Sequence, residues 1–348
     1  MSVSALIQEA QPIGIAAADA VLLGGHFWPR VSGPAAGTAI INPATGVLAC
    51  YYHHYARFLA VHGFDVVTYD YRGIGASRPA QLRGCGYRWR EWGEKDFEAV
   101  LAWVLARDGS APVSVVGHSV GGALPGLAGH APAIHRLLSV GGQFGCWRHY
   151  APARRSRLFL KWHVAMPALT ALFGYFPGRR LGWLEDLPAG IAYEWAFRRP
   201  YLEDNYPQRQ REAVLRGFDA VTAPILAVTM SDDDIATVPA ISAVLDRYRG
   251  AQRTQILLRP ADLGQEKIGH FSLFHNRHAT GFWLDTLLWL RDGVNPPARQ
   301  GGGERFLLSL WEKVTMLSTS PRLSPASPPA LPRRRCRRAG CEVPAELR

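Results

Sequence analysis

The sequence has few cysteines and a modest share of charge, and these shortages exclude several classes of protein. Charged residues make up 19% and hydrophobic residues 48% of the 348 positions, as in folded globular proteins and unlike disordered ones. The five cysteines are scattered, and no CxxC pair occurs among Cys50, Cys85, Cys146, Cys336 and Cys341. We therefore expect reduced thiols and a cytoplasmic protein.

Signals for secretion and membrane insertion are also missing. The chain opens with Met1-Ser2-Val3-Ser4 and its first basic residue is Arg30, so we expect no signal peptide. The longest apolar stretch, residues 158–176, is interrupted by a lysine, a histidine and a proline. An interrupted stretch of this kind argues against a membrane span.

Motifs for common cofactors are absent as well. The phosphate-binding pattern GxxxxGK[S/T] and the zinc pattern HExxH do not occur. Gly73-Ile74-Gly75 lacks the third glycine and the following helix of a dinucleotide site. We expect neither a cofactor nor a metal, and we interpret Cys85 as an ordinary loop cysteine.

What is present is an alternation of short apolar segments with helical patterns. The expected strands cover residues 13–17, 21–28, 37–42, 64–70, 112–116, 137–140, 225–230 and 255–258. The expected helices cover residues 51–62, 92–107, 239–248 and 280–290. Such alternation predicts an α/β fold with a mostly parallel central sheet flanked by helices, and reactive groups collect at the carboxyl ends of its strands.

Two segments depart from this pattern. Residues 142–222 lack strand-like alternation and are rich in aromatic residues and arginine, so we expect a helical lid. Additional helices packed on the core are the alternative. The core then consists of residues 1–141 and 223–292.

The last segment, residues 293–348, is typical of a disordered basic tail. It contains Gly301-Gly302-Gly303, several Ser-Pro pairs and Arg333-Arg334-Arg335. Ten Lys and Arg and four Asp and Glu follow residue 293, so this segment carries more than half of the net charge of +11. We interpret the arginine cluster of the tail as a solvated run, with contact to an acidic surface or to nucleic acid as the alternative, and we expect no nucleic acid at the core.

The most informative motif is Gly117-His118-Ser119-Val120-Gly121, which directly follows an apolar β-branched run. A strand, a G-x-S-x-G turn and a helix in this order form a nucleophile elbow. The turn strains the serine backbone, so small residues must flank it, and the glycines supply that space. We therefore expect Ser119 to be a nucleophile; an idle serine in a glycine-rich turn is the alternative.

A serine nucleophile needs a base and a carboxylate that orients the base, and at elbows these follow in the order Ser, acid, His. Asp232, Asp233 and Asp234 follow an expected strand, and we favour Asp233 over its two neighbours. His270 lies in a loop before the final helix and is the expected base. His275 and His278 compete, but they stand at the start of that helix.

The reaction also needs two N–H donors for the oxyanion. Val120, directly after the serine, is expected to supply one. The other should come from the loop after Asn42, where Pro43 has no N–H; Ala44 is the first choice and Thr45 the second.

Three of these motifs together resemble the α/β-hydrolase superfamily over residues 10–292. Asp70-Tyr71-Arg72-Gly73-Ile74-Gly75-Ala76-Ser77 is similar to its D-x-R-G-x-G-x-S segment, the elbow matches, and Gly269-His270 matches its histidine loop. Within it, the chain looks most similar to bacterial hydrolases near serine aminopeptidases and monoacylglycerol lipases. One departure is Asn42-Pro43, where many relatives carry His-Gly.

The resemblance and the motifs together imply a serine hydrolase that cleaves an ester, thioester or related acyl bond through an acyl-enzyme; a peptidase is included. The aromatic lid favours an apolar or aromatic small-molecule substrate, and its basic residues leave room for a negative one. The alternatives are a non-catalytic protein that binds a small ligand on the same fold, and an acyltransferase.

Overall fold

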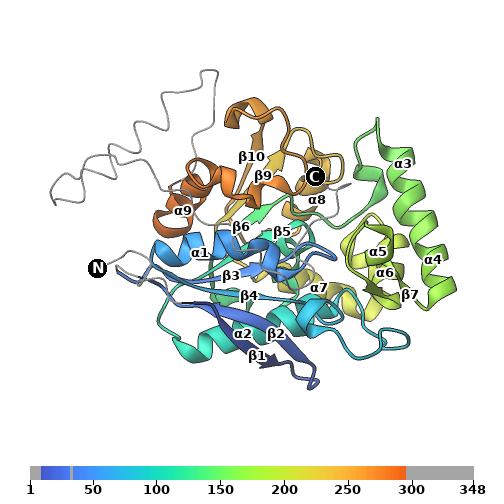
Figure 1. The fold of residues 1–348 in the computed structure, drawn as a ribbon, viewed down its shortest axis with the longest axis horizontal. Coiled ribbons are helices and arrows are strands. Elements are labelled where there is room, and N and C mark those ends of the chain that lie inside the picture. The colour runs from blue at the N-terminus through green and yellow to red at the C-terminus, as the bar shows by residue number, and fades with distance from the viewer. Residues whose placement is uncertain (1–8, 32–33, 295–348) are drawn as a thin grey trace. The chain divides into compact units, whose positions relative to one another are not determined.

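An eight-stranded sheet lies at the centre of the chain (Figure 1). The computed structural model describes residues 9–31 and 34–294, so nearly all of the expected tail over residues 293–348 lies outside it. The strand order in the sheet is β1-β2-β4-β3-β5-β6-β9-β10. The strands are β1 (Gln11–Ala16), β2 (Leu22–Trp28), β3 (Gly37–Asn42), β4 (Phe64–Tyr69), β5 (Val113–His118), β6 (Ile134–Val140), β9 (Ile225–Met230) and β10 (Arg253–Leu258).

The sheet is mostly parallel, as the alternation predicts. Strands β4, β3, β5, β6, β9 and β10 pair in parallel, and only β1 and β2 run antiparallel to their neighbours. The β1–β2 turn places Ala20 at φ 62°, a backbone conformation that favours glycine. The expected hairpin is therefore confirmed, with an alanine in a strained position.

Helices cover both faces of the sheet. Tyr55 and Leu59 of α1 pack with Trp283 and Leu287 of α9 in one core, which also includes the buried residues Ile41 and Val116. On the opposite face, α2 and α8 belong to a second core, whose side chains include Val100, Leu101, Ile241 and Val244. The helices are α1 (His53–Val61), α2 (Glu98–Arg107), α3 (Arg155–Phe159), α4 (Met166–Phe173), α5 (Gly178–Leu181), α6 (Ala189–Ala196), α7 (Gln208–Asp219), α8 (Val238–Leu245) and α9 (Phe282–Asp292).

The structure corrects two expectations about these elements. No long helix follows β5; the chain forms two short 3-10 turns, Ser119–Gly122 and Leu124–Leu127, because glycines and Pro125 disfavour an α-helix there. Residues 142–222 are not purely helical either, since β7 (Tyr175–Phe176) and β8 (Leu187–Pro188) pair antiparallel. The remainder of that segment carries α3 to α7.

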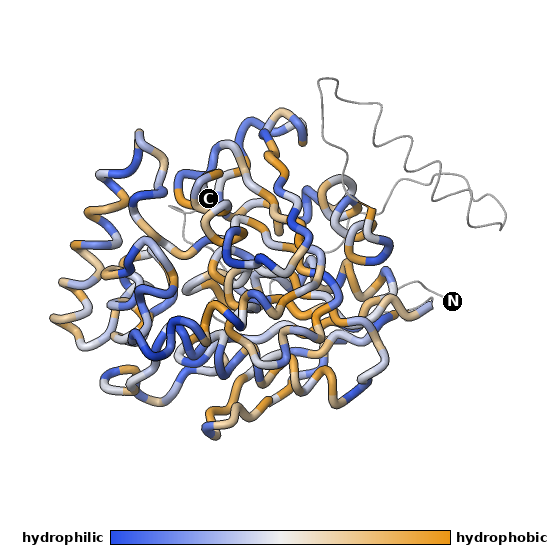
Figure 2. Tube along the Cα trace, turned by 180° about the vertical axis from the view of Figure 1, so that it is seen from behind, coloured by the Kyte–Doolittle hydropathy of each residue, from blue (hydrophilic) through white to orange (hydrophobic). Residues whose placement is uncertain are grey.

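The outer surface of residues 142–222 includes apolar side chains. Figure 2 shows hydrophobic and hydrophilic positions alternating along the continuous helical stretch from α3 into α4. Leu160 and Leu172 on this stretch are exposed. In the part of the chain that the structure describes, no helix is both long and apolar enough to cross a bilayer.

The cysteines only partly follow expectation. Cys85 and Cys146 are free thiols. Cys50, at the start of the turn before α1, is disulfide-bonded. The expectation that every cysteine is reduced is therefore wrong for Cys50, because an isolated position in the sequence does not reveal what approaches it in space.

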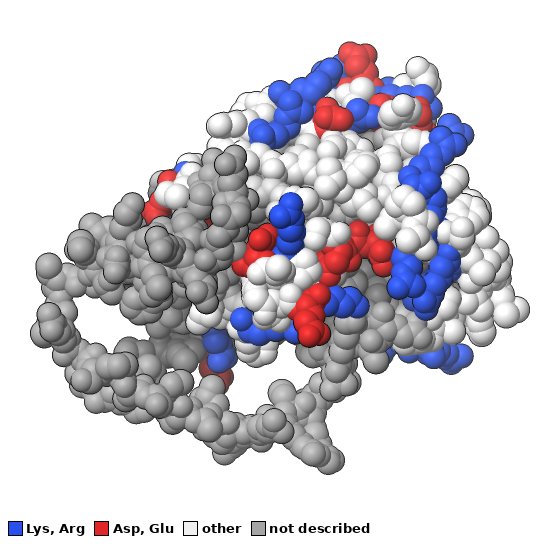
Figure 3. All heavy atoms as spheres, turned by 90° about the horizontal axis from the view of Figure 1, so that it is seen from above, with Lys and Arg blue, Asp and Glu red and all other residues white. Residues whose placement is uncertain are grey.

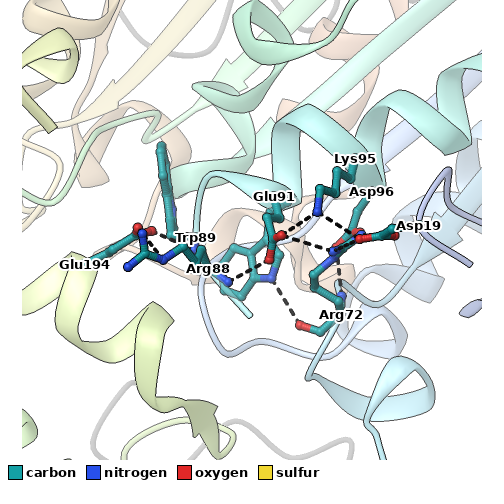
Figure 4. A network of polar contacts seen from close by, with 9 residues as sticks. Asp19, Arg72, Arg88, Trp89, Glu91, Lys95, Asp96 and Glu194 are labelled. Carbon is teal, nitrogen blue, oxygen red and sulfur yellow. Dashed lines mark hydrogen bonds and ion pairs between the residues drawn. The ribbon is translucent and has the colours of Figure 1, made fainter. Parts of the chain in front are cut away.

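The Asp70–Ser77 motif has a structural role. The Asp70 carboxylate accepts hydrogen bonds from the backbone N–H groups of Ala49 (2.7 Å) and Ala76 (2.9 Å), which hold the loop after β4. Arg72 is fully buried, and its guanidinium contacts Asp96 at 2.7 Å and Asp19 at 2.8 Å. Figure 4 shows this network joining the β1–β2 turn to the segment that leads into α2.

Candidate active site

Ser119 occupies the sharp turn that its motif predicts. It lies directly after β5 with φ 54°, a left-handed conformation that is costly for a residue with a side chain, and it is 4% exposed. A Cβ atom at Gly117 would collide with the backbone of Gly121 and Gly122, and one at Gly121 would collide with the carbonyl of Asn42. Glycine is therefore required on both sides of Ser119.

His270 and Asp233 lie together as expected. His270 Nδ1 is 2.6 Å from Asp233 Oδ2, and the Asp233 side chain is fully buried. Asp233 Oδ1 accepts hydrogen bonds from the backbone N–H groups of Ile235 (2.8 Å) and Ala236 (2.9 Å). Burial pushes the pKa of Asp233 upward, but His270 and these donors outweigh it, so the net shift is downward and the carboxylate is ionised at neutral pH.

The three consecutive aspartates have different environments. Asp232 Oδ2 accepts hydrogen bonds from the backbone N–H groups of Ile268 (2.8 Å) and Gly269 (3.0 Å), so it holds the loop that carries His270. Asp234 is half exposed and lies 3.8 Å from Arg154. Asp233 is thus the member of the run that contacts His270.

The competing histidines are placed elsewhere. His275 Nε2 lies 3.0 Å from the Tyr51 hydroxyl, in the turn before α9. His278 is buried in the next turn, where burial lowers its pKa to about 4. Neither side chain lines the cavity that contains Ser119.

Ser119 Oγ accepts a hydrogen bond from Gln143 Nε2 at 3.2 Å. The Gln143 carboxamide is oriented by its Oε1 atom, which accepts from the Gly145 N–H. Within residues 9–31 and 34–294, no hydrogen bond joins Ser119 Oγ to His270, although both residues line the same cavity. Catalytic hydrogen bonds of this type are often long without substrate and shorten when it binds.

A buried chain of hydrogen bonds connects the loops around Ser119. The Ala44 N–H donates to the Tyr52 hydroxyl (2.9 Å), which lies 2.7 Å from His118 Nδ1. His118 Nε2 lies 2.8 Å from the carbonyl oxygen of His270. Because that carbonyl only accepts, His118 carries its proton on Nε2 and accepts the Tyr52 proton at Nδ1.

The pKa values of Tyr52 and His118 agree with these hydrogen-bond directions. Burial lowers the pKa of His118 to about 3, so the ring is neutral at physiological pH. Burial raises the pKa of Tyr52 far above its ordinary value, so its hydroxyl keeps its proton. These hydrogen bonds therefore position His270 through its backbone carbonyl group.

These hydrogen bonds distinguish the two N–H groups that were expected as the second oxyanion donor. The Ala44 N–H, the first choice from the sequence, is occupied by Tyr52. The Thr45 N–H has no hydrogen-bond partner among the described residues, and Thr45 lines the cavity with Ser119 and Val120. Asn42, which stands where many relatives carry histidine, donates from Nδ2 to the Gly121 carbonyl (3.3 Å) and ties the end of β3 to the elbow.

The cavity around Ser119 is built by five strand ends and by the 142–222 segment. The loops after β3, β5, β6, β9 and β10 contribute Thr45, Ser119, Gln143, Ile235 and His270. The 142–222 segment adds an aromatic and basic wall that includes Trp162, Trp195 and Arg198. The space available is narrow, about 30 Å³.

Several of these residues have no signal in the sequence that would identify them. Gln143 follows β6 at the carboxyl edge, so its position could have been noted, but its contact with Ser119 depends on the loop conformation. Tyr52 and Arg198 reach the site from helical segments whose sequences carry no catalytic motif. No group of three or more His, Cys, Asp or Glu side chains in the described residues is arranged to hold a metal ion.

The known proteins to which this chain is similar are hydrolases. The family model described as serine aminopeptidase, S33, matches residues 35–207, which is just under half of the chain. A solved structure of a soluble variant of monoglyceride lipase from Saccharomyces cerevisiae, in complex with a substrate analog, is similar in fold. It is 14% identical, with a TM-score of 0.59, and the match covers 84% of this chain and 98% of that chain.

Two esterase structures are also similar in fold, with lower TM-scores. The esterase PF2001 from Pyrococcus furiosus is 14% identical, with a TM-score of 0.52 and coverage of 82% of this chain and 94% of that one. The esterase domain of a Rhodothermus marinus protein is 15% identical, with a TM-score of 0.51 and coverage of 82% and 98%. At these identities the likeness is one of fold, and the chemistry has to be argued from the site.

Proposed function

We propose that this chain, which has the fold of α/β-hydrolases, is a serine hydrolase that cleaves an ester, thioester or related acyl bond through an acyl-enzyme. One observation supports this most: a strained, buried Ser119 shares a cavity with His270, whose ring is bonded to the buried Asp233 at 2.6 Å. Nucleophilic catalysis by serine needs this combination of a nucleophile, a base and an orienting carboxylate.

In the proposed acylation step, Ser119 Oγ bonds to the carbonyl carbon while its proton moves to His270 Nε2. Asp233 accepts from His270 Nδ1, fixes the ring and stabilises its charged form. The oxyanion is bound by the N–H groups of Val120 and Thr45, and Gln143 Nε2, already beside Ser119 Oγ, is positioned to assist. The bond to the leaving group then breaks, and His270 returns the proton to it.

Deacylation uses the same groups. A water molecule gives its proton to His270 and attacks the acyl carbon, and the proton passes to Ser119 Oγ as the ester bond to the serine breaks. If another acceptor occupied the place of water, the acyl group would pass to that acceptor and the protein would be an acyltransferase.

The substrate proposal rests on the wall of the cavity. Trp162 and Trp195 stack with their ring centroids 4.7 Å apart, which favours an apolar or aromatic acyl group. Because the remaining space is narrow, we infer that residues 142–222 move outward when such a group binds, as a lid would. The cytoplasmic location stays a prediction.

Labelling with a fluorophosphonate probe tests the proposal. The wild type should be labelled, and Ser119→Ala should not, because the probe bonds to an activated serine oxygen. Equal labelling of both would place the nucleophile elsewhere. No labelling of the wild type, together with no hydrolysis of short p-nitrophenyl esters, would contradict the hydrolase and favour a non-catalytic binding protein.

A further inference from the structure

Arg198 is a buried cation in the wall of the cavity that contains Ser119. It follows α6 and is 8% exposed. Its guanidinium lies over the ring of Trp89, with the Cζ atom 4.0 Å from the ring centroid, and Nη1 donates to the carbonyl of Phe144. Phe144 directly follows Gln143, whose side chain donates a hydrogen bond to Ser119. One short loop therefore contacts both Arg198 and the proposed nucleophile.

The side chain keeps its charge but has no carboxylate partner. Burial lowers the pKa of Arg198 to about 10, which still leaves it protonated at neutral pH. Among the described residues no ion pair involves Arg198, and no Asp or Glu lines this cavity. A buried guanidinium without a counter-ion is costly, so a structure that retains one at a cavity wall favours an anionic ligand there.

The nearest acidic side chain is already occupied. Glu194, one turn before Arg198, accepts from the Trp89 N–H (2.9 Å) and lies 3.2 Å from Arg90 and 3.5 Å from Arg88. Figure 4 shows the Glu194 carboxylate directed toward Trp89 and Arg88. Glu194 therefore forms its ion pairs with the two outer arginines, and it acts on Arg198 only through space, by raising its pKa without a direct contact.

Arg198 and Trp89 also line a second, outer groove of about 490 Å³. Two carboxylates and five arginines line that groove: Glu194 and Asp204, with Arg88, Arg90, Arg198, Arg199 and Arg211. Asp204 is bonded to Arg211 at 2.8 Å. On the face seen in Figure 3, basic and acidic side chains are interspersed around a broad uncharged area.

We propose that the substrate carries an anionic oxygen group, a carboxylate or a phosphate, which binds Arg198 at the junction of the catalytic cavity and the arginine-lined groove. The proposal rests on the hydrolase function argued above and specifies its substrate class. A guanidinium presents two parallel N–H donors that match a carboxylate or phosphate, and the rings of Trp89 and Trp162 line the same cavity.

Two matched pairs of esters test this on the wild-type protein. The first pair is mono-p-nitrophenyl glutarate and its uncharged carboxamide counterpart. The second pair is monobutyrylglycerol phosphate and monobutyrylglycerol. We expect kcat/KM for the charged member of at least one pair to exceed that of the neutral member by roughly 10- to 100-fold, the range of a charge-assisted hydrogen bond. The responding pair identifies the group as carboxylate or phosphate.

A variant connects the preference to the residue. Arg198→Met should reduce the charged-to-neutral ratio toward one. Arg107→Met is the matched control, since Arg107 also stacks on aromatic rings, those of Phe27 and Trp103, but lies outside the cavity; its ratio should equal that of the wild type. Where Arg198→Met does not fold, Arg198→Lys serves, because it keeps the charge but loses the paired donors and should lower the ratio partway.

Equal rates on both members of both pairs in the wild type would overturn the proposal, as would a preference that Arg198 variants leave unchanged. These failures are distinct from failure of the hydrolase, which shows as missing fluorophosphonate labelling. In that case thermal unfolding with glutarate, inorganic phosphate or glutaramide still tests the site, since only an anion that binds the folded protein raises its melting temperature. No shift with either anion would then overturn it.

Discussion

Replacing Asp233 by asparagine tests the site more sharply than removing the side chain. In the wild type, Asp233 Oδ1 accepts two backbone N–H groups and Oδ2 accepts from His270 Nδ1. In Asp233→Asn, the two N–H donors require the amide oxygen at the Oδ1 position, so the amide NH₂ faces His270. That ring must then accept at Nδ1 and carry its proton on Nε2, where it cannot take the proton of Ser119.

The wrong tautomer should cost about 10⁴-fold in kcat, as tautomer reversal does in serine proteases, while the backbone geometry is retained. Asp232→Asn should cost about 10-fold, because it weakens the hold on the histidine loop without altering the ring. Asp234→Asn removes an exposed charge and should change kcat by less than about 2-fold.

Steady-state hydrolysis of a p-nitrophenyl ester measures all three variants, and circular dichroism with thermal unfolding checks that each is folded. The informative result is the order in which the three variants lose kcat, since the three aspartates are chemically identical and adjacent in the chain. If Asp233→Asn retained activity within 10-fold of Asp234→Asn, the assignment of Asp233 as the orienting acid would be refuted.

Three further outcomes follow from the contacts around the serine. Tyr52→Phe should destabilise the protein by about 1–3 kcal/mol in urea unfolding, because the Ala44 N–H and His118 Nδ1 lose their partner; full stability would contradict the buried chain. Gln143→Ala should lower kcat/KM about 10-fold with little change in melting temperature, and an unchanged kcat/KM would remove Gln143 from the mechanism. The folded-state pKa of His118, about 3, lies below its ordinary value of 6.5, so between these values the unfolded chain binds a proton that the folded chain does not. The free energy of unfolding should therefore fall as pH drops from 6.5 toward 3, by up to about 1.4 kcal/mol per pH unit from this residue, and His118→Gln should flatten the slope seen in urea unfolding at stepped pH.

Local patterns were enough to predict most of the sheet. The bounds expected for β3 and β9, residues 37–42 and 225–230, are those observed, because buried β-branched runs between turn residues have few alternatives. The helix expected after the elbow does not form, because Gly121, Gly122 and Pro125 disfavour an α-helix there. The choice among three aspartates needed the hydrogen bonds of Asp232 and Asp233, which depend on a loop from residues more than 30 positions away.

By itself, the sequence determined the succession of strands and helices along the chain and the sharp turn at Ser119, because these depend on residues that are neighbours in the chain. Only the tertiary structure decided that Tyr52 occupies the Ala44 N–H, that Gln143 reaches Ser119 and that Arg198 stands unpaired in the same cavity. Gln143 and Ser119 follow different strands, and Arg198 reaches the cavity from the segment after α6, whereas Tyr52 and Ala44 both follow β3. Their distance and orientation arise from packing, which no local pattern encodes.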